Sequence, residues 1–572
     1  MIASIGDAET CVFNPPPAEL PLEFALDFHF KENPNHPALI YPTKWETRLR
    51  TYTYQELVPA VHRAGQWISK AIKFQHSASS CPAPVVMILL KTDTMTYLTV
   101  IAGLMRAGIT AFPVSPRFSP IVVAHLLRTC QPKAVIFNNG SKPLLTQALE
   151  ECVEGRAGSP LLCELPTFST FYPGHNMYTP LPAHERGPGD ISIITHSSSS
   201  SSLFPKVIAW SSGVILHHGA TEEFPVHQYA GRILGAFGLE LFHGLGMCMF
   251  FKMVQKGLVL GIMDPTEQTS ILPVDPNDMF RCFELTQPDF LITNPRVIEL
   301  WAKDPQKVAA LADSSANIVY GGRFLSKSVG DMLVKSGVRL CSSYGATEIG
   351  PISLLPHFQD DDWEYWTINP RPDVHFIPRD DGLVELVMAP TAVLNYKSIS
   401  NAVWDGKLAY NPGDLLIAHP TKENTYRMFG RSSDQIMLAT GEMINPIELE
   451  CELSKHALVS SAVMFGHSRF TVGIVIDRVH GCYLHDEAFI EEICRRVQLQ
   501  VSIVLVHITK GWNNNTSGLK SFQFTNFQMV IVANAKKPIQ ISPKGLPRRP
   551  TVWLEYQDEM DTLYRKDLGV RR

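Results

Sequence analysis

The chain has 572 residues, too many for one compact core, so at least two domains are expected. Hydrophobic residues make up 45% of the chain, which is typical of a globular protein and excludes an intrinsically disordered one. The net charge is −5 and no block of like charges occurs, so we expect neither nucleic acid nor an anionic membrane as a partner.

Cysteine usage and apolar runs bear on the compartment. The eleven cysteines include no CxxC pair, which disfavours a zinc site and a disulfide framework and indicates a reducing compartment. The opening stretch MIASIGDAETCVFNPPP has acids and prolines where a signal peptide needs basic and then apolar residues. The longest apolar runs, such as Val85–Leu90, are far shorter than a membrane span. We therefore expect a cytoplasmic protein with no membrane partner.

Short apolar runs alternate with helical patterns from residue 85 onward. Val85–Leu90 is a candidate buried strand, and Thr94–Ala107 has the spacing of a helix. Ala111–Val114 and Ala134–Phe137 read as two further strands, on either side of a helical pattern at Ser119–Thr129. Strands that alternate with helices in this way predict a parallel α/β sheet.

A hydroxyl-rich loop follows the apolar run Ile191–Ile194. Six consecutive serines, Ser197–Ser202, lead to Pro205 and Lys206. Small residues let backbone N–H groups approach phosphates, hydroxyls add donors, and a lysine neutralises charge. The pattern indicates a phosphate-binding loop, and a serine-rich flexible loop is the alternative.

Two later motifs also carry polar side chains next to glycines. In Leu239–Gly246, LELFHGLG, glycines beside His243 favour a pocket wall over a buried structural histidine. In Ser342–Glu348, SSYGATE, the acid Glu348 follows a predicted strand and is an oxygen ligand suited to Mg²⁺. A strand-end turn with an exposed acid is the alternative for this second motif.

These motifs resemble those of the adenylate-forming enzymes, the superfamily of acyl-CoA synthetases, luciferases and peptide-synthetase adenylation domains. THSSSSSSLFPKVI resembles the family's phosphate loop, with Ser199 and Ser202 at its two glycine positions, and YGATE is the most specific match. The segments Ala111–Leu127 and Gly441–Glu448 resemble more narrowly the fungal adenylate-forming reductases, which activate a carboxylic acid before reducing it.

The resemblance implies a role for each candidate residue. The serine loop and Lys206 would hold the β- and γ-phosphates of ATP, and Asp414 and Arg431 would hold the ribose. Arg323 would either clamp a carboxylate-bearing substrate or block the pocket. The implied catalytic residues are Lys206, Thr347, Glu348 (also the Mg²⁺ ligand) and Lys544; the implied nucleotide-binding residues are Thr195, Ser197, Ser198, Ser200, Ser201, Gly321, Gly322, Tyr344, Asp414 and Arg431; and the implied acid-pocket residues are His243, Gly246 and Arg323.

The implied fold is α/β, with a large N-terminal adenylation domain (1–429) of parallel-rich sheets and helices and a small mobile α+β C-terminal domain (430–572). Residues 497–525 do not resemble the family, and we interpret them as an insertion or a gene-model artefact. The implied reaction is ATP-dependent activation of an aryl, keto or other organic acid to an acyl-adenylate. Transfer to a thiol, either CoA or the phosphopantetheine of a carrier protein, would follow.

Several positions depart from the family pattern. Besides the two serines in the loop, Ser433 and Met437 stand at hinge positions that usually carry charge, and Pro550 replaces the C-terminal lysine. Lys544, Arg548 and Arg549 are candidate substitutes for that lysine. Losing one well-placed charged contact costs roughly 10²–10³ in rate. The alternative is therefore a catalytically degenerate homologue, or a fragment of a larger reductase, that binds only nucleotide or a partner.

Overall fold

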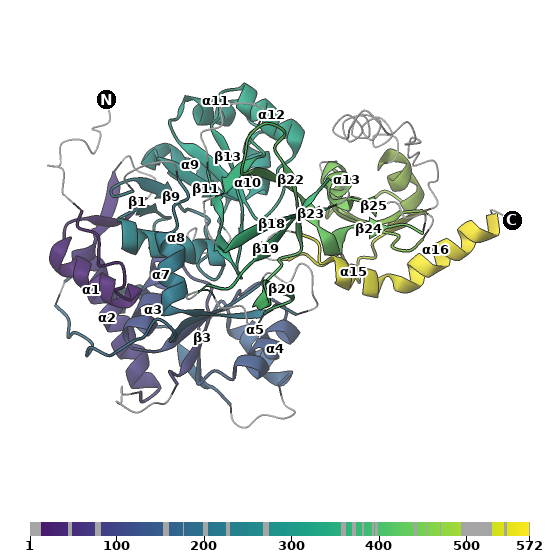
Figure 1. Cartoon of the computed structure of the whole chain (residues 1–572). Coiled ribbons are helices and arrows are strands. Elements are labelled where there is room, and N and C mark those ends of the chain that lie inside the picture. Colours follow the sequence, from purple (N-terminus) through teal and green to yellow (C-terminus); the bar gives the residue numbers. More distant parts are fainter. Residues whose placement is uncertain are drawn as a thin grey trace. The chain divides into compact units, whose positions relative to one another are not determined.

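The computed structural model describes residues 13–43, 48–74, 82–152, 159–175, 177–197, 204–224, 229–266, 274–355, 362–368, 373–379, 382–391, 394, 399–439, 443–454, 456–469, 471–493, 529–542 and 546–570. The chain divides into two compact units (Figure 1). Unit 1 holds the described residues up to Ser197, Phe204–Pro412 and Ile417–Met428, and unit 2 holds Gly413–Leu416 and the described residues from Phe429 onward. The predicted domain boundary at 429 stays a prediction, and the segment 497–525 lies outside the described residues.

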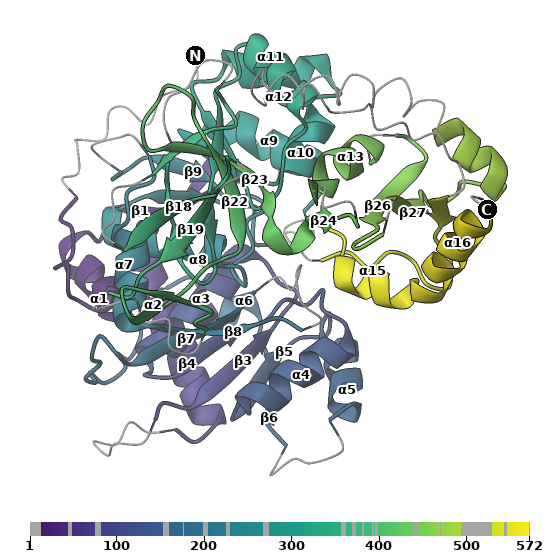
Figure 2. The ribbon, with the colours of Figure 1, turned by 45° about the vertical axis from the view of Figure 1, so that its right-hand side comes forward.

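The first sheet of unit 1 has the strand order β6-β5-β3-β4-β7-β8, and all its neighbouring strands are parallel except β7 and β8. Side chains of α4 and α5 pack with β3, β4 and β5 in one hydrophobic cluster, so these helices cover one face (Figure 2). The elements are β3 (Val85–Leu89), β4 (Thr110–Pro113), β5 (Ala134–Phe137), β6 (Leu161–Glu164), β7 (Ile191–His196), β8 (Val207–Ser211), α4 (Pro120–Cys130), α5 (Lys142–Glu150) and α6 (Phe168–Phe171).

The second sheet has the order β13-β12-β11-β9-β10-β1-β2, and its neighbouring strands are parallel except β1 and β2. Helices α9 to α12 pack their apolar side chains with those of β11 to β13. The elements are β1 (Pro37–Pro42), β2 (Leu49–Thr53), β9 (Ile233–Gly235), β10 (Val259–Gly261), β11 (Phe290–Thr293), β12 (Asn317–Gly321), β13 (Leu340–Ser343), α9 (Pro276–Thr286), α10 (Pro295–Trp301), α11 (Pro305–Asp313) and α12 (Lys327–Lys335).

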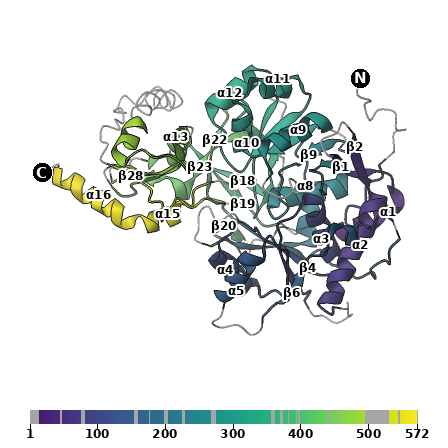
Figure 3. The same ribbon diagram turned by 180° about the vertical axis from the view of Figure 1, so that it is seen from behind.

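A shared apolar core lies among the helices α1 (Leu22–Glu32), α2 (Tyr54–Ala71), α3 (Thr94–Arg106), α7 (Ser212–Ala220) and α8 (Gly244–Lys256), which pack with strands of both sheets (Figure 3). Every residue of α3 is buried, which explains its apolar sequence on all sides. Gly103 of α3 faces α2, where an added Cβ would stand 2.8 Å from the Ala64 Cβ. The two helices therefore pack backbone against backbone.

A third sheet in the second half of the chain has the order β16-β17-β23-β22-β19-β18. The chain passes between the two units in its strands β22 and β23. The remaining strands of this half are β14 (Gly345–Ala346), β15 (Gly350–Pro351), β16 (Ser353–Leu354), β17 (Trp366–Ile368), β18 (Val374–Pro378), β19 (Val384–Met388), β20 (Ala402–Trp404), β21 (Lys407–Ala409), β22 (Asp414–Ala418) and β23 (Thr425–Arg431).

Unit 2 is an α+β unit around β26. Alternate residues of β26 enter two different apolar clusters, one with α13 and a helix over 486–493, the other with α15 and α16. This period of two is what a strand buried on both faces requires. The elements are β24 (Ile436–Met437), β25 (Met443–Ile444), β26 (Val459–Phe465), β27 (Gly473–Arg478), β28 (Val530–Val532), α13 (Pro446–Leu453), α15 (Arg549–Glu555) and α16 (Gln557–Val570).

The α/β fold with parallel-rich sheets expected from the sequence is confirmed. The predicted strand at 85–90 is β3, and the predicted helix at 119–129 is α4, shifted by one residue. In the described part of the chain, no helix combines the length and apolar character needed to cross a membrane.

A buried histidine links α1 to α8 and gives unit 1 a pH-dependent stability. His29 Nε2 lies 2.5 Å from the Val254 carbonyl oxygen, and Asn33 Nδ2 donates to His29 Nδ1 at 2.8 Å, so the imidazole is neutral and donates from Nε2. Burial lowers its pKa from 6.5 to about 4. Between these values the unfolded chain binds a proton that the folded chain does not. The free energy of unfolding therefore falls as the pH falls, by about 3 kcal/mol for this group.

We expect the melting temperature to drop between pH 6.5 and pH 4, and the variant His29→Gln to drop less steeply. Differential scanning calorimetry at pH 7, 6, 5 and 4.5 measures both slopes. The exposed His175 provides the control, since His175→Gln should keep the wild-type slope. A His29→Gln variant with the wild-type slope would show that this imidazole does not contribute.

Candidate active site

The ends of the predicted phosphate loop are joined by hydrogen bonds. Strands β7 and β8 pair with His196 opposite Val207, and the Ser197 N–H donates to the Lys206 carbonyl oxygen at 2.9 Å. In return, the Lys206 N–H donates to Ser197 Oγ at 2.9 Å. The Lys206 ammonium lies 5.5 Å from the centre of the Tyr410 ring, at the range of a cation–π contact. Ser198, Ser200 and Ser201 lie outside the described residues.

His196 fixes the base of this loop. The Ser115 N–H donates to His196 Nε2 at 3.2 Å, so the proton of the neutral ring is on Nδ1, which donates to the Ser197 carbonyl oxygen at 3.1 Å. Burial, and to a lesser extent the nearby His243, lower the pKa of His196 to about 3. The ring is therefore neutral and connects the loop to the turn after β4. Thr195, another candidate, is fully buried in β7.

The YGATE motif forms a turn after β13, held by two hydrogen bonds to its backbone and by one ring contact. The Tyr344 N–H donates to Ser353 Oγ at 2.9 Å, and Trp210 Nε1 of β8 donates to the Thr347 carbonyl oxygen at 3.1 Å. The Tyr344 ring stacks on Trp366 with 4.7 Å between centroids. The Trp210 bond places the turn directly beside the strand that leaves the phosphate loop.

The glycine pair at the end of β12, Gly321 and Gly322, lies against β13, the strand that precedes the YGATE turn. An added Cβ at Gly321 would stand 2.8 Å from the Ser343 carbonyl oxygen, and Gly322 has a left-handed backbone with φ of 73°. Both positions therefore require glycine. Arg323 follows them and is partly buried, and its Nε is buried without a hydrogen-bond partner among the described residues.

The LELFHGLG motif forms the start of α8 and reaches the same turn. His243 is the residue before the helix, and an added Cβ on Gly244 would stand 3.5 Å from both the Thr347 Cα and Trp210. An added Cβ on Gly246 would stand only 2.4 Å from the Glu240 carbonyl oxygen, so this position requires glycine; its place in the acid pocket stays a prediction. Gly246 lets the first turn of α8 close onto the preceding loop.

The donor set around Thr347 and Glu348 fits a magnesium–phosphate group. Glu348 is partly exposed and has no ion pair or hydrogen bond with any other described residue, so its carboxylate is open to a ligand. No group of three or more His, Cys, Asp or Glu side chains suited to a metal occurs in the described ranges. A single carboxylate agrees with Mg²⁺, which usually binds one or two carboxylates together with substrate phosphates.

Comparisons with known proteins decide the family. The model of the AMP-binding enzymes matches residues 26–372, and that of the AMP-binding enzyme C-terminal domain matches residues 433–508. The chain belongs to the AMP-binding enzyme family. The resemblance seen in the motifs is thereby confirmed.

Curated members of the AMP-binding family include fungal reductases. The adenylate-forming reductase Nps10 of Heterobasidion annosum is 30% identical over 96% of this chain and 50% of its own length. The 4-hydroxybenzoate–CoA/benzoate–CoA ligase of Rhodopseudomonas palustris is 24% identical, over 73% of this chain and 76% of the ligase. The chain thus spans about half the length of the curated reductases it matches.

A solved structure shares the fold. ATP-bound MatB of Rhodopseudomonas palustris superposes with a TM-score of 0.64 at 14% identity, over 95% of this chain and 100% of MatB. At this identity the match supports the fold alone.

The two ribose candidates of this AMP-binding enzyme form a pair within unit 2. Arg431 Nε donates to the nearly buried Asp414 Oδ1 at 3.1 Å. The Ser432 N–H donates to the Gly413 carbonyl oxygen at 2.7 Å, and Gln435 Nε2 donates to the Arg431 carbonyl oxygen at 3.1 Å. These bonds fix the backbone on both sides of the pair, so the Asp414 carboxylate is held in place before any ligand binds.

Arg549 is not a substitute for the missing C-terminal lysine. Its guanidinium donates to both oxygens of the buried Glu450, at 2.7 and 2.8 Å, and Asp434 lies 3.8 Å away. This arginine is therefore a structural residue of unit 2. Lys544 lies outside the described residues and stays a prediction.

Sequence reasoning missed three residues that shape the site. Trp210 and Ser353 hold the YGATE turn, and Glu240 contacts His243. Trp210 lies four residues after Lys206 and Ser353 five residues after Glu348, outside both motifs, and neither residue type by itself indicates phosphate chemistry. Glu240 is part of LELFHGLG, and a negative charge next to a predicted acid pocket could have indicated that it interacts with a neighbouring residue.

Proposed function

We propose that this chain uses ATP and Mg²⁺ to activate a carboxylic acid, forming an acyl-adenylate and releasing pyrophosphate. The observation that carries the proposal is the contact of three motifs at Thr347. The phosphate-loop strand through Trp210, the LFHG helix start through Gly244, and the YGATE turn itself all meet there. Adenylation requires the phosphates and the acid to meet at one place, and this arrangement supports it.

The proposed roles follow from position and chemistry. Ser197 and Lys206 are the described ends of the loop that holds the β- and γ-phosphates, and the Thr347 hydroxyl donates to the α-phosphate. Glu348 holds Mg²⁺, which supplies positive charge to the phosphate oxygens when it is bound. Positioning and charge neutralisation are the whole of the catalysis, with no covalent bond to the protein.

The remaining nucleotide contacts are assigned in the same way. Tyr344 has one face against Trp366 and offers the other to the adenine, while the Gly321–Gly322 backbone lies along the acid and the adenine. Asp414 and Arg431 of unit 2 bind the ribose. Lys544 supplies the charge that stabilises attack of the carboxylate on the α-phosphate.

We propose that the acyl group then passes to a thiol. The relatives' names favour two acceptors: CoA, as for the benzoate–CoA ligase, and a carrier phosphopantetheine in a reductase-type protein. The two are distinguished by adding CoA or a phosphopantetheinylated carrier protein to the loaded enzyme and detecting the thioester by mass spectrometry.

Acid-dependent exchange of pyrophosphate into ATP tests the activation step. The panel contains benzoate, 4-hydroxybenzoate, phenylpyruvate and propionate, each with ATP and Mg²⁺. Exchange that depends on one of these acids supports the proposal and names the class of acid. Folded protein that binds ATP, measured by calorimetry, yet exchanges with none of them would favour the degenerate homologue, in which Pro550 and the serines of the loop have ended turnover.

Arg323 is expected to set the preference among acids. Its buried Nε has no hydrogen-bond partner among the described residues, and a buried unsatisfied donor costs about 1–3 kcal/mol, which an anionic group on the substrate would offset. We expect Arg323→Met to raise KM about tenfold for isophthalate, a dicarboxylic acid, while KM for benzoate changes less than threefold. Equal effects on both acids would show that Arg323 does not bind a second carboxylate.

A further inference from the structure

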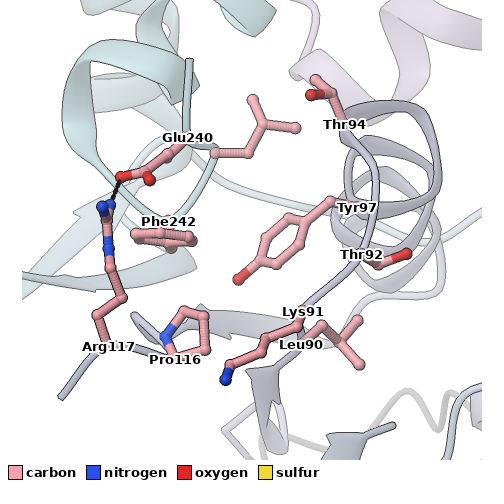
Figure 4. A pocket seen from close by; sticks show the side chains of 10 residues that line it. Leu90, Lys91, Thr92, Thr94, Tyr97, Pro116, Arg117, Glu240 and Phe242 are labelled. Atoms are coloured by element: carbon pink, nitrogen blue, oxygen red, sulfur yellow. Dashed lines mark ion pairs between the residues drawn. The ribbon is translucent and has the colours of Figure 1, made fainter. Parts of the chain in front are cut away.

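A series of side-chain contacts leads from the surface of unit 1 to His243. Arg117, in the loop after β4, forms an ion pair with Glu240 Oε2 (Figure 4). The same oxygen lies 3.3 Å from His243 Nε2, which is buried and makes no hydrogen bond with any described residue. Glu240 therefore stands between a permanent cation and the imidazole that the family resemblance places at the acid pocket.

The three side chains differ in their exposure to solvent. The side chain of Glu240 is 12% exposed and that of His243 17%, while Arg117 at 34% retains access to water. The Arg117 guanidinium also lies 5.7 Å from the ring centre of Phe242, the residue before His243. Arg117 thus contacts both Glu240 and Phe242, in the loop just before α8.

The ion pair also borders a cavity of about 130 Å³. Phe242, Tyr97 and Pro116 line it together with Arg117 and Glu240, and Figure 4 shows the Tyr97 hydroxyl pointing toward the side on which Phe242 and Pro116 lie. Lys91, Thr92 and Thr94 also line the cavity, so the ion pair borders a partly polar space.

His243 stands close to the proposed reaction centre. Its ring lies 6.2 Å from that of His196 at the base of the phosphate loop, and the next residue, Gly244, lies against Thr347. An uncompensated carboxylate at Glu240 would repel a carboxylate substrate near His243. Arg117 cancels that charge without removing the contact between Glu240 and His243.

We propose that Arg117 and Glu240 are positioning residues for the acid substrate. Glu240 holds the His243 imidazole in place, and Arg117 neutralises Glu240 so that the wall of the pocket accepts a carboxylate. This inference rests on the proposed function, because it concerns the binding of the acid that the chain activates.

The proposed neutralisation of Glu240 by Arg117 is tested by measuring KM for the acid in pyrophosphate exchange. Benzoate is the first probe, and the other acids of the panel follow. Arg117→Gln should raise KM for the acid about tenfold, with KM for ATP and kcat within twofold. Arg117→Lys keeps the positive charge and should stay within threefold of the wild type. Arg117→Gln/Glu240→Gln removes both charges and should return KM to within threefold of the wild type.

A matched control comes from another ion pair of unit 1. Arg232 pairs with Asp289 at 2.7 Å and is 52% exposed, so Arg232→Gln should leave KM for the acid unchanged. If the double variant is as impaired as Arg117→Gln, or if Arg117→Lys is equally impaired, charge neutralisation is not the role of Arg117 and the inference is overturned.

The contact between Glu240 and His243 is tested by a measurement that does not depend on catalytic activity. Peptide mass mapping after brief treatment with diethyl pyrocarbonate measures how fast each imidazole is modified. Glu240→Ala should increase labelling of His243 at least threefold, while labelling of the exposed His175 stays constant. Unchanged labelling of His243 would overturn the positioning role. If instead the wild type exchanges with no acid but the labelling rises, the proposed function fails while the contact stands.

Discussion

Replacing Glu348 by Gln should lower the rate of acid-dependent pyrophosphate exchange by roughly 10²–10³. The substitution keeps the size of the side chain and removes the charge that binds Mg²⁺ beside the α-phosphate contact of Thr347. Because Glu348 has no ion pair with another described residue, stability should change by less than ~0.5 kcal/mol. Exchange rates at saturating Mg²⁺ and ATP, together with a thermal melt, measure the two effects separately.

The control for this variant is a glutamate of the same unit that is engaged elsewhere. Glu385 of β19 lies 3.4 Å from Arg379, and Glu385→Gln should exchange at the wild-type rate. A Glu348→Gln enzyme with more than a tenth of the wild-type activity would rule out a role for this carboxylate in binding the metal. The role of the YGATE turn would then reduce to the backbone and the Thr347 hydroxyl.

The largest expected effect on stability comes from Arg549. Arg549→Met leaves the Glu450 carboxylate buried without its partner, and breaking a buried pair in this way costs about 3–5 kcal/mol. The loss should appear in the unfolding transition of unit 2, followed by calorimetry or by urea titration. Arg549→Met/Glu450→Met removes both charges and should recover most of the stability, since apolar residues of similar volume can replace such a pair.

An exposed pair in the same unit gives the comparison. Arg469 and Asp561 lie 2.7 Å apart with side chains 46% and 41% exposed, so Asp561→Asn should cost at most about 1 kcal/mol. An Arg549→Met variant that is no less stable than Asp561→Asn would mean that the Glu450 pair does not hold the unit together. In that case Arg549 would again be a candidate for a role in catalysis.

The position of Arg549 has a consequence for the hinge. Asp434 follows Arg431 in the motif that joins the units, and it lies 3.8 Å from the Arg549 guanidinium. The same arginine therefore connects the hinge segment, α13 and α15 within unit 2. Loss of Arg549 is expected to weaken ATP binding as well, because the Asp414–Arg431 pair is fixed by the backbone of this segment.

Local sequence was enough to predict the elements that carry the phosphate loop and the YGATE turn. Runs of apolar β-branched residues such as Val85–Leu89 form buried parallel strands because both their faces are covered by helices. The phosphate loop follows β7 of the first sheet and YGATE follows β13 of the second, so their approach through Trp210 and Thr347 could not be predicted from their order along the chain.

Tertiary packing determined the contacts of residues that the motifs alone did not predict. Gly246 allows α8 to approach the Glu240 carbonyl oxygen, a contact that depends on how the chain turns before the helix. Arg548 and Arg549 are adjacent residues of the same type, yet Arg549 forms an ion pair with Glu450, 99 residues away. No sequence pattern gives such a distance, because the pairing depends on where β26 and α15 meet.

The sequence by itself determined the family, the α/β class and the residue types available for phosphate, ribose and metal, because these depend on local motifs and on periodicity. Only the tertiary structure decided which charges are free to act. Glu348 is left open, Arg549 is buried in an ion pair, and Glu240 is neutralised by an arginine more than a hundred residues earlier in the chain. The physical reason is that burial and charge pairing are properties of the folded arrangement, and residues distant in the chain supply both.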